Sequence, residues 1–374
     1  MQIDEQNRTS LLGFTLQELT SLMEEASQPP YRGKQLFHAL YAERADALEQ
    51  ISTLPQDFRN ALTQKGFEVG LPSIEKKFVS TDGTVRYLLS FSDGQSVEAV
   101  WMPEGDCGES GDGSEAGEQE SAHGWNRATI CLSSQVGCAV DCQFCLTALL
   151  GVKRNLTAGE IVGQVCAVLK DQNVTPPNER VNLVFMGMGE PLLNFPNFIK
   201  AVKLFVDGVG IPESRMTVST AGIVPRIYDL SAEDVRPKLA ISLNASNDEQ
   251  RTQLMPINKK WNLEKLISAA RDFQLRPREK LTFEYVLLDE VNDAPQNARE
   301  VVELIRGLRA KVNLIALNPG PGIAFRTPSQ QRVLEFQRIL MDSGVPTFIR
   351  RPRGRDIFAA CGQLKRTAEL ESVS

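Results

Sequence analysis

The stretch that decides the fold runs from Cys131 to Cys145 and reads CLSSQVGCAVDCQFC. Inside it, Cys138, Cys142 and Cys145 form a CxxxCxxC pattern. Three thiolates at this spacing suit a soft metal centre better than a disulfide, and they are one ligand short of a closed tetrahedral site. One position at the metal would therefore stay open for a substrate or cofactor. Phe144, between the last two cysteines, would supply an apolar wall against solvent.

Two kinds of metal centre remain open from the spacing alone. An iron–sulfur cluster would use the three cysteines and leave one iron accessible. A zinc ion would need a fourth ligand from elsewhere, and histidine is poorly supplied because the chain has only His38 and His123. Ligand softness favours the iron–sulfur centre.

Composition indicates a globular protein of 374 residues, 42% hydrophobic and 24% charged, with room for one large domain and a small one. No apolar run approaches the length of a membrane span. The N-terminus lacks the basic start and apolar core of a secretory signal. We therefore expect a cytoplasmic protein without a membrane partner, in which seven cysteines serve metal and redox chemistry rather than structural disulfides.

The formal net charge of −6 is unevenly spread. One Gly/Ser-rich stretch, residues 104–126, holds seven acidic residues: Glu104, Asp106, Glu109, Asp112, Glu115, Glu118 and Glu120. Without these seven, the rest of the chain would carry a formal charge of +1. The stretch has too little apolar content to fold, so we predict a disordered acidic loop. The overall charge then excludes no nucleic-acid partner.

Residues 1–75 are predicted to form a small helical domain. A helix capped by Thr15, a second over residues 31–41 and a third near residues 58–65 are expected. The second helix begins with an aromatic and two basic residues, Tyr31, Arg32 and Lys34. They either contact RNA or form an ordinary solvated basic edge, and the sequence leaves both interpretations open.

Residues 76–103 are predicted to form a β-hairpin extension. Asp82-Gly83 and Asp93-Gly94 are turn signals between apolar-rich runs. In the last run, SVEAVWM, Glu98 shares one face with Val100 and Met102. On the residues alone, a single glutamate on such a face is expected at an exposed edge of the sheet.

From residue 128 onward, strand and helix patterns alternate. Strands are predicted at 128–133, 181–187, 215–220, 238–243, 281–288, 312–317 and 345–349. Helices are predicted at 157–171, 195–207, 223–231, 262–273, 295–309 and 328–343. The fold class is therefore α/β, a partial (β/α)6 TIM-like barrel over residues 127–350, followed by a C-terminal segment over 351–374. Catalytic groups belong at the carboxyl ends of the strands, and the cysteine cluster follows the first strand.

Short polar residues end several of these strands. They occur in MGMGEP after the second strand, in STAG after the third, in SLN after the fourth and in NP after the sixth. Each could be an ordinary turn. As a set at one mouth of a barrel, they indicate a cofactor-binding rim.

The cysteine motif followed by a βα chain resembles the radical S-adenosylmethionine (SAM) superfamily. Two more features, the extra Cys131 and the sequence DIFAACGQL around Cys361, make residues 10–365 similar to the RlmN family of RNA adenine-C2 methyltransferases. The stretches VEAVWMP, VSTAG, ISLNA, PINK and NLIALNP carry the same resemblance.

The resemblance implies a role for each matching residue. Cys138, Cys142 and Cys145 would hold a 4Fe-4S cluster, Cys361 would carry the methyl group, Cys131 would resolve the adduct and Glu98 would be the general base. The implied SAM contacts are Gly189, Glu190, Ser219, Ser242, Leu243, Asn244 and Asn318. Asn244 stands where some family members carry His. Arg350, Arg351, Arg353 and Arg355, just before Cys361, would favour its thiolate and attract phosphate.

The implied reaction uses two SAM molecules per turnover, one to methylate Cys361 and one to generate a radical, and it ends in a transient disulfide between Cys361 and Cys131. The implied partners are 23S rRNA, tRNA and an electron donor such as flavodoxin, and the implied oligomeric state is a monomer. Two rival interpretations are a Cfr-like enzyme acting on adenine C8, and a zinc-bound RNA-binding protein without catalysis. The second leaves Glu98 and the Cys361 motif without a purpose.

Overall fold

The structure is a computed structural model that describes residues 8–103, 125 and 127–364. The predicted acidic loop lies outside these residues except for Trp125, as do the ends of the first and last predicted segments. Within the described residues, no helix is long and apolar enough to cross a membrane.

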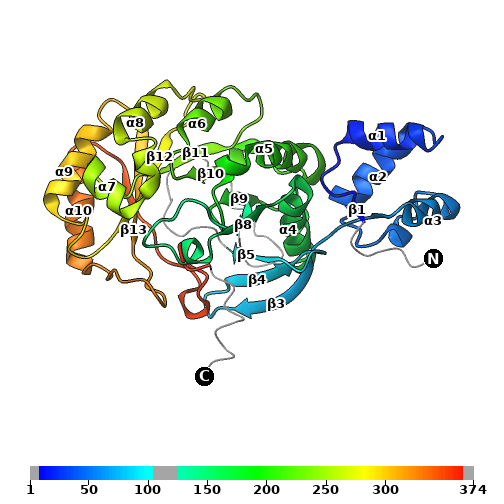
Figure 1. Ribbon diagram of the computed structural model, residues 1–374, viewed down its shortest axis with the longest axis horizontal. Helices are drawn as coiled ribbons and strands as arrows, with labels where there is room; N and C mark the ends of the chain where they lie inside the picture. Colours follow the sequence, from blue (N-terminus) through cyan, green and yellow to red (C-terminus); the bar gives the residue numbers. More distant parts are fainter. Residues whose placement is uncertain (1–7, 104–124, 126, 365–374) are drawn as a thin grey trace.

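One long sheet organises the molecule (Figure 1). Within the described residues it has ten strands, in the spatial order β14-β13-β12-β11-β10-β9-β6-β5-β4-β3. Seven of them run parallel: β6 (Ala128–Cys131), β9 (Val181–Phe185), β10 (Met216–Thr220), β11 (Lys238–Ser242), β12 (Leu281–Leu287), β13 (Ala310–Ala316) and β14 (Thr347–Ile349). This confirms the α/β class and the seven predicted strands.

Helices cover the outer side of the parallel strands (Figure 1). They are α4 (Ala158–Asp171), α5 (Phe195–Leu204), α6 (Val224–Ser231), α8 (Leu263–Asp272), α9 (Pro295–Leu304) and α10 (Gln330–Asp342), with the short α7 (Asp248–Leu254) before α8. A capping box at Thr157 starts α4, at the first residue of the predicted helix 157–171. Phe185 of β9 packs edge-on against Phe198 of α5, with ring centroids 4.8 Å apart, so the apolar side of the sheet faces the helices.

Three antiparallel strands extend the sheet at its other edge: β3 (Ser73–Val79), β4 (Val85–Ser90) and β5 (Ser96–Pro103). The two predicted Asp-Gly turns join them. Strand β5 pairs with β6 in the register Val100 to Cys131, so the extension continues the barrel sheet. Because the extension lies against β6, its residues can reach the interior of the barrel.

The opposite side of the sheet, which we call the inner face, is defined by residues that are partners across neighbouring strands. Paired residues in a sheet point to the same side. From β3 to β14 these are Phe78, Arg86, Val100, Cys131, Val184, Thr217 and Lys238, then Ser242, Glu284, Asn313 and Phe348. Glu98, two residues from Val100, shares this face.

The N-terminal residues form a helical module beside the barrel (Figure 1). It contains α1 (Leu16–Glu25), α2 (Tyr31–Tyr41) and α3 (Gln56–Gln64), with a short parallel ribbon of β1 (Thr9–Ser10) and β2 (Phe67–Glu68) that the sequence did not predict. The module is attached through its own polar groups. Lys200 of α5 pairs with Glu18 (2.7 Å) and Lys170 of α4 pairs with Asp46, while the Tyr41 hydroxyl donates to Phe14 O (2.7 Å) inside the module.

Candidate active site

The cysteine motif lies on a loop between two short strands that pair with each other, β7 (Gln135–Gly137) and β8 (Val152–Asn155). The backbone N–H of Cys138 donates to Gly151 O (3.0 Å), which closes the base of the loop. Gly137 has φ +81°, and a Cβ there would lie 1.7 Å from Gly151 O, so the closure requires glycine. Cys138, Cys142 and Cys145 therefore lie on one closed loop at the carboxyl end of β6.

The three cysteines border one cavity, together with Phe144, as the sequence predicted for that ring. Burial and the negative charges of Glu190 and Cys145 raise the pKa of Cys138 to about 12, and burial with the neighbouring thiols raises that of Cys142 well above its usual value. Bound iron would supply the positive charge that such thiols need to ionise.

The cysteines border a shared space and do not converge on one point. Among the described residues, no three His, Cys, Asp or Glu side chains are grouped so that one metal ion could be held. A 4Fe-4S cluster takes its thiolates on separate irons, and this donor arrangement fits it.

The GMGE turn after β9 forms the second wall of the cavity. Gly189 has φ +98°, and a Cβ there would lie 2.6 Å from Gln135 Cβ. Glu190 is held by N–H groups of Ala221 (2.7 Å) and Leu192 (3.0 Å). Burial outweighs these bonds and raises the pKa of Glu190 to about 7. The turn therefore aims a fixed carboxyl group into the cavity, where it can receive a cationic amino group.

The strand ends supply a polar rim, as predicted. Ser219, Ser242, Asn244 and Asn318 all line the cavity. The Ser219 hydroxyl donates to Glu284 Oε2 (2.6 Å) and lies 3.1 Å from the Ser242 hydroxyl.

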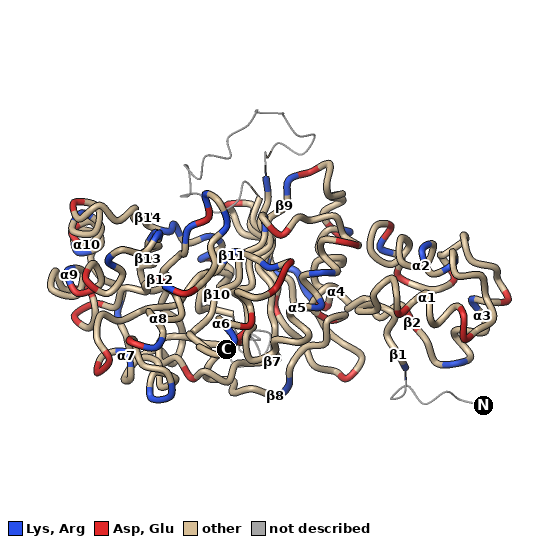
Figure 2. The backbone as a smooth tube through the Cα atoms, turned by 90° about the horizontal axis from the view of Figure 1, so that it is seen from above, with Lys and Arg blue, Asp and Glu red and all other residues tan. Residues whose placement is uncertain are grey.

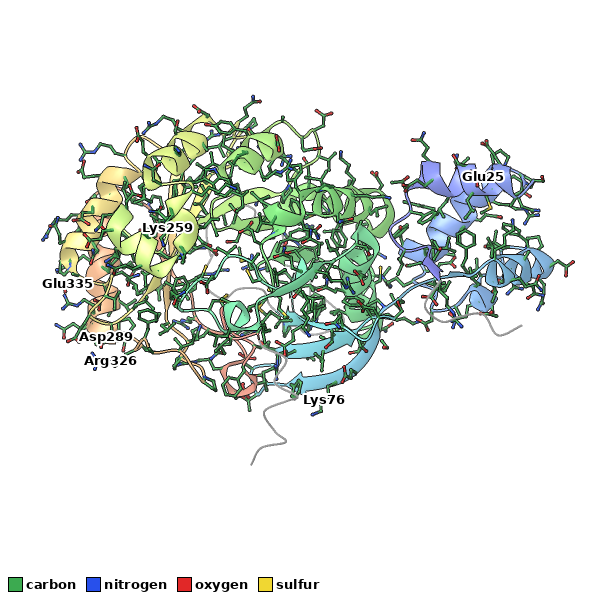
Figure 3. The ribbon with its side chains drawn as sticks, viewed as in Figure 1. Glu25, Lys76, Lys259, Asp289, Arg326 and Glu335 are labelled. Carbon is green, nitrogen blue, oxygen red and sulfur yellow. The ribbon has the colours of Figure 1, made fainter. Side chains whose placement is uncertain are left out.

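Asn244 and Asn318 are held by different contacts, and the Asn318 side-chain amide donates to Cys361 O (3.5 Å). Asn244, at φ +57°, accepts from the N–H of Val286 (2.8 Å) through Oδ1. Beyond Asn318, the loop is fastened by Arg326, which pairs with Asp289 (3.2 Å; Figure 3).

Leu243 is the exception among the predicted SAM contacts. Its side chain is fully buried in the core and does not line the cavity. Its backbone lies at the site, because it joins Ser242 to Asn244, which both line the cavity, and its N–H donates to Glu284 O (2.9 Å). Only a backbone contact with a cofactor is therefore compatible with the position of Leu243.

Cys361 reaches the cavity from the C-terminal segment. The backbone around it is bonded to both neighbouring loops: Leu146 N–H donates to Gly362 O (2.9 Å), and the Gln363 side chain donates to Pro319 O (2.9 Å). Cys361 is exposed and lines the cavity beside the cysteine motif. An exposed thiol is thus presented to the same space as the three cysteines.

The start of this segment is clasped to the first hairpin turn. Gly354 N–H donates to Asp82 Oδ2 (3.0 Å), while Asp356 accepts from the Ser80 hydroxyl (2.5 Å) and the Thr81 N–H (3.2 Å). Each side of this contact offers a carboxylate to the other. We call it the carboxylate clasp.

Cys131 lies deeper, on the inner face of β6. Burial raises the pKa of its thiol strongly, and the negative charge that Cys361 would carry raises it further, which places the two sulfurs within electrostatic reach. Both are free thiols in the structure.

Glu98 is not at an exposed edge, and that expectation from the residues alone was wrong. Strand β5 is flanked by β4 on one side and β6 on the other, and Glu98 is 1% exposed. Its carboxylate forms an ion pair with Arg86, whose guanidinium lies 4.1 Å from the ring centroid of Phe78. The carboxylate is therefore buried, charged and on the inner face, outside the walls of the main cavity.

Three residues that the sequence analysis missed help build the site. Glu284 lines the cavity, Arg86 pairs with Glu98, and Arg251 is fully buried while donating to Ala221 O (2.7 Å) and Ser242 O (3.2 Å). A polar residue at an inner position of a strand is a visible signal for Glu284 and Arg86. Nothing in the sequence pattern of the short helix α7 singles out Arg251.

The predicted RNA-contacting residues lie apart from the cavity. Tyr31 is exposed at the start of α2, with the Arg32 guanidinium 5.7 Å from its ring centroid, so both interpretations of this edge stay open. In the run before Cys361, Arg353 donates to Pro103 O (2.6 Å) and so serves the backbone, while Arg351 and Arg355 are exposed.

Comparison with known proteins gives three findings. The sequence profile of the radical SAM superfamily matches residues 132–305. The chain is 67% identical to the probable dual-specificity RNA methyltransferase RlmN of Koribacter versatilis, over 94% of this chain and all of that protein. It is 43% identical to the dual-specificity RNA methyltransferase RlmN of Syntrophobacter fumaroxidans, over 94% of this chain and 96% of that one.

A solved structure agrees over nearly the whole length. The crystal structure of a radical SAM methyltransferase from Sphaerobacter thermophilus superposes with a TM-score of 0.85 at 38% identity, covering 96% of this chain and 99% of that one.

Proposed function

Because the chain belongs to the RlmN family of dual-specificity RNA methyltransferases, within the radical SAM superfamily, we propose that it methylates C2 of a specific adenosine in 23S rRNA and in a subset of tRNAs. The observation that supports this most is the single cavity that brings Cys361 to the cysteine motif and the strand-end rim. Membership of the superfamily implies SAM and a 4Fe-4S cluster.

Cys138, Cys142 and Cys145 are the residues we assign to the cluster, and Glu190 with the strand-end residues to SAM. The carboxyl group of Glu190 suits the amino group of SAM, and the hydroxyls of Ser219 and Ser242 suit its sugar. When bound, the cluster and two SAM molecules per turnover supply a methyl group to Cys361 and the one-electron chemistry that activates it.

The protein's own residues then divide the remaining work. The exposed Cys361 thiolate takes the methyl group by displacement and afterwards joins that carbon to C2 of the adenine. Glu98 removes the C2 proton, and its ion pair with Arg86 fixes the position of the carboxylate.

Release of the product falls to Cys131. Its sulfur attacks the Cys361 sulfur, and an S–S bond forms while the bond from sulfur to the transferred carbon breaks. The electron pair of that bond stays on the carbon, and the proton that the Cys131 thiol gives up completes the methyl group. The burial of Cys131 supports this order, because it keeps the thiol protonated and unreactive beforehand. An outside reductant restores both thiols, and an electron donor such as flavodoxin serves the cluster. We propose that the enzyme works as a monomer in the cytoplasm.

The role of Cys131 can be tested with Cys131→Ala. The expected result is a covalent protein–RNA adduct that persists on a denaturing gel and disappears when Cys361 is also changed to Ala. Normal turnover by Cys131→Ala would remove the resolving role.

The proposed reaction itself is tested by nucleoside mass spectrometry of rRNA and tRNA from cells with and without the gene. Loss of 2-methyladenosine from both pools is expected, and loss from one pool would narrow the substrate. Appearance of 8-methyladenosine with the gene would instead favour the Cfr-like activity. No change in any methyladenosine would overturn the proposal.

A further inference from the structure

Arg251 is a fully buried cation that has no charged partner in contact. Its guanidinium forms no ion pair with any residue that the structure describes, and every acceptor that it reaches is neutral. The acceptors are the backbone carbonyl groups of Ala221, Ser242 and Leu243 (2.7, 3.2 and 3.1 Å) and the side-chain carbonyl of Asn258 (3.0 Å). Buried charges in proteins are normally paired with an opposite charge. This one therefore points to an anionic group that the protein binds nearby.

The Arg251 guanidinium lies directly behind the wall of the active-site cavity. Ala221 and Ser242, whose carbonyl groups it binds, both line that cavity. The end of α7 is also joined to the cysteine loop, because Gln143 N–H donates to Leu254 O (3.0 Å). Figure 2 shows α7 at the same end of the barrel as β7 and β8, the strands that bound this loop. The cavity wall thus separates Arg251 from the space assigned to the cluster.

Arg251 and Cys142 lie within electrostatic reach of each other. Cys142 packs against a small hydrophobic cluster that contains Leu254 and Met255, at the end of α7. Burial lowers the pKa of Arg251 to about 10, and the negative charge that Cys142 would carry acts in the opposite direction. The guanidinium therefore stays charged at neutral pH, close to a cysteine of the motif.

We propose that Arg251 is the counter-charge of the iron–sulfur cluster and raises its reduction potential, so that the cluster accepts its electron more readily. One electron passes from the donor to the cluster, and the positive charge behind Cys142 stabilises the negative charge that this electron adds. Arg251 acts through the cluster and does not touch the substrate. This inference rests on the cluster assignment within the proposed function, and it does not depend on which RNA is methylated.

The size of the effect follows from Coulomb's law. A unit charge about 10 Å away, in surroundings with an effective dielectric constant of about 20, changes a one-electron equilibrium by roughly tenfold. Because Arg251 is fully buried, salt screens its charge little. Removing the charge should therefore lower the ratio of reduced to oxidised cluster about tenfold at a fixed potential, which is a shift of about 59 mV for one electron.

The test uses full-length protein with its cluster rebuilt under anaerobic conditions, in the absence of SAM and RNA. Arg251→Met removes the charge, whereas Arg251→Lys keeps the charge and loses the planar set of donors. The potential is measured from the electron paramagnetic resonance signal of the reduced cluster during a redox titration with mediators. The ratio of reduced to oxidised cluster should fall about tenfold in Arg251→Met, and Arg251→Lys should stay close to the unaltered protein.

Asp248 offers a test of the opposite sign, which also decides the matter if Arg251→Met does not fold. Its Oδ1 accepts from Asn258 Nδ2 (2.9 Å) and Leu263 N–H (2.8 Å), and its charge opposes that of Arg251. Asp248→Asn keeps an oxygen acceptor for both hydrogen bonds and removes the negative charge. The ratio of reduced to oxidised cluster should then rise, by about twofold because Asp248 is exposed and screened.

Glu249→Gln is the matched control on the same helix. The Glu249 side chain is exposed and forms no hydrogen bond or ion pair with the part of the chain that the structure describes. Its loss removes one negative charge, as in Asp248→Asn, but leaves the bonds around Arg251 intact. The potential should therefore be unchanged.

The outcomes separate this inference from the function beneath it. An unchanged potential in Arg251→Met, or an unchanged or lowered potential in Asp248→Asn, would overturn the role of Arg251. Equal shifts in Arg251→Met and Arg251→Lys would also overturn it, because they would reflect lost hydrogen bonds instead of lost charge. If the unaltered protein takes up no iron, the cluster assignment fails and this inference fails with it. If a normal cluster forms but no RNA is methylated, only the proposed substrate fails.

Discussion

The carboxylate clasp predicts that Asp82 in a hairpin turn controls the order of the segment bearing Cys361. In Asp82→Asn the Asn-Gly turn remains favourable, and the side-chain oxygen can still accept from Thr84 N–H, which now lies 2.9 Å from Oδ1. The contact that disappears is the one from Gly354 N–H to Oδ2. Burial tends to raise the pKa of Asp82, but the hydrogen bonds from Gly354 and Thr84 outweigh it and lower the pKa to about 2. These bonds therefore favour the ionised carboxylate.

The expected magnitude follows from the partial exposure of the turn. A hydrogen bond to a charged group contributes roughly 1.5–3 kcal/mol, and solvent screening at a part-exposed site reduces this to about 1 kcal/mol. The ratio of docked to undocked segment should therefore fall about fivefold. The Leu146 amide, whose acceptor is Gly362 O, reports docking directly, and the Ala359 amide, bonded to Gly354 O within the segment, reports the order of the segment itself. Hydrogen exchange at both amides should accelerate about fivefold.

Asp93→Asn is the control, because Asp93 occupies the equivalent turn between β4 and β5. Its carboxylate accepts from Gln95 N–H (3.0 Å) and Arg154 Nε (2.7 Å), and it does not touch the Cys361 segment. Exchange at Leu146 and Ala359 should be unaffected in that variant. If Asp82→Asn also leaves both amides unchanged, the clasp does not hold the segment and the reasoning is refuted.

Three further changes have defined outcomes. Arg86→Met removes the ion-pair partner of the buried Glu98 carboxylate and should lower the free energy of unfolding by about 3–5 kcal/mol in urea titrations. Adding Glu98→Leu should recover much of the lost free energy. An equal loss in the double variant would contradict the role of the ion pair. The pKa of Glu190 is raised to about 7, so its proton must leave when a cationic amino group binds. The affinity for SAM should therefore fall as the pH drops from 7 to 5.5. Titration calorimetry should find this pH dependence absent in Glu190→Gln. Gly189→Ala would place a Cβ 2.6 Å from Gln135 Cβ, at a backbone φ of +98°. SAM binding measured by calorimetry should weaken at least tenfold. Wild-type affinity in this variant would show that the turn can relax.

Much of the barrel could be predicted because its signals are local. The parallel strands carry apolar side chains at alternate positions, as Met216 and Val218 do in β10, and the start of helix α4 is marked by a capping box at Thr157. The positions that failed depend on partners distant in sequence. Glu98 looked like an edge residue because the pairing of β5 with both β4 and β6 is invisible in its own pattern. Arg251 was missed because its acceptors are carbonyl groups on other strands.

In the candidate site, too, features with a local sequence signal could be predicted and contacts between distant residues could not. The strand-end residues were predictable from motif spacing, and the cavity brings them together as expected. Leu243 lies next to Ser242 and Asn244 in sequence, yet strand alternation turns its side chain into the core. The carboxylate clasp was beyond prediction, since it joins residues 80–82 to residues 354–356 through two loops with no periodic signal.

The position of Cys361 on a segment outside the sheet makes the proposed methyl carrier separable from the rest of the active site. The cysteine motif, the GMGE turn and the strand ends all precede residue 319, while Cys361 follows the last strand, β14. Under the proposed chemistry, a protease cut just after β14 would create a damaged enzyme that still consumes SAM and electrons but delivers nothing to RNA. Mass spectrometry would detect the truncated protein by its lower mass. Its activity would be recognised by consumption of SAM without methylation of RNA.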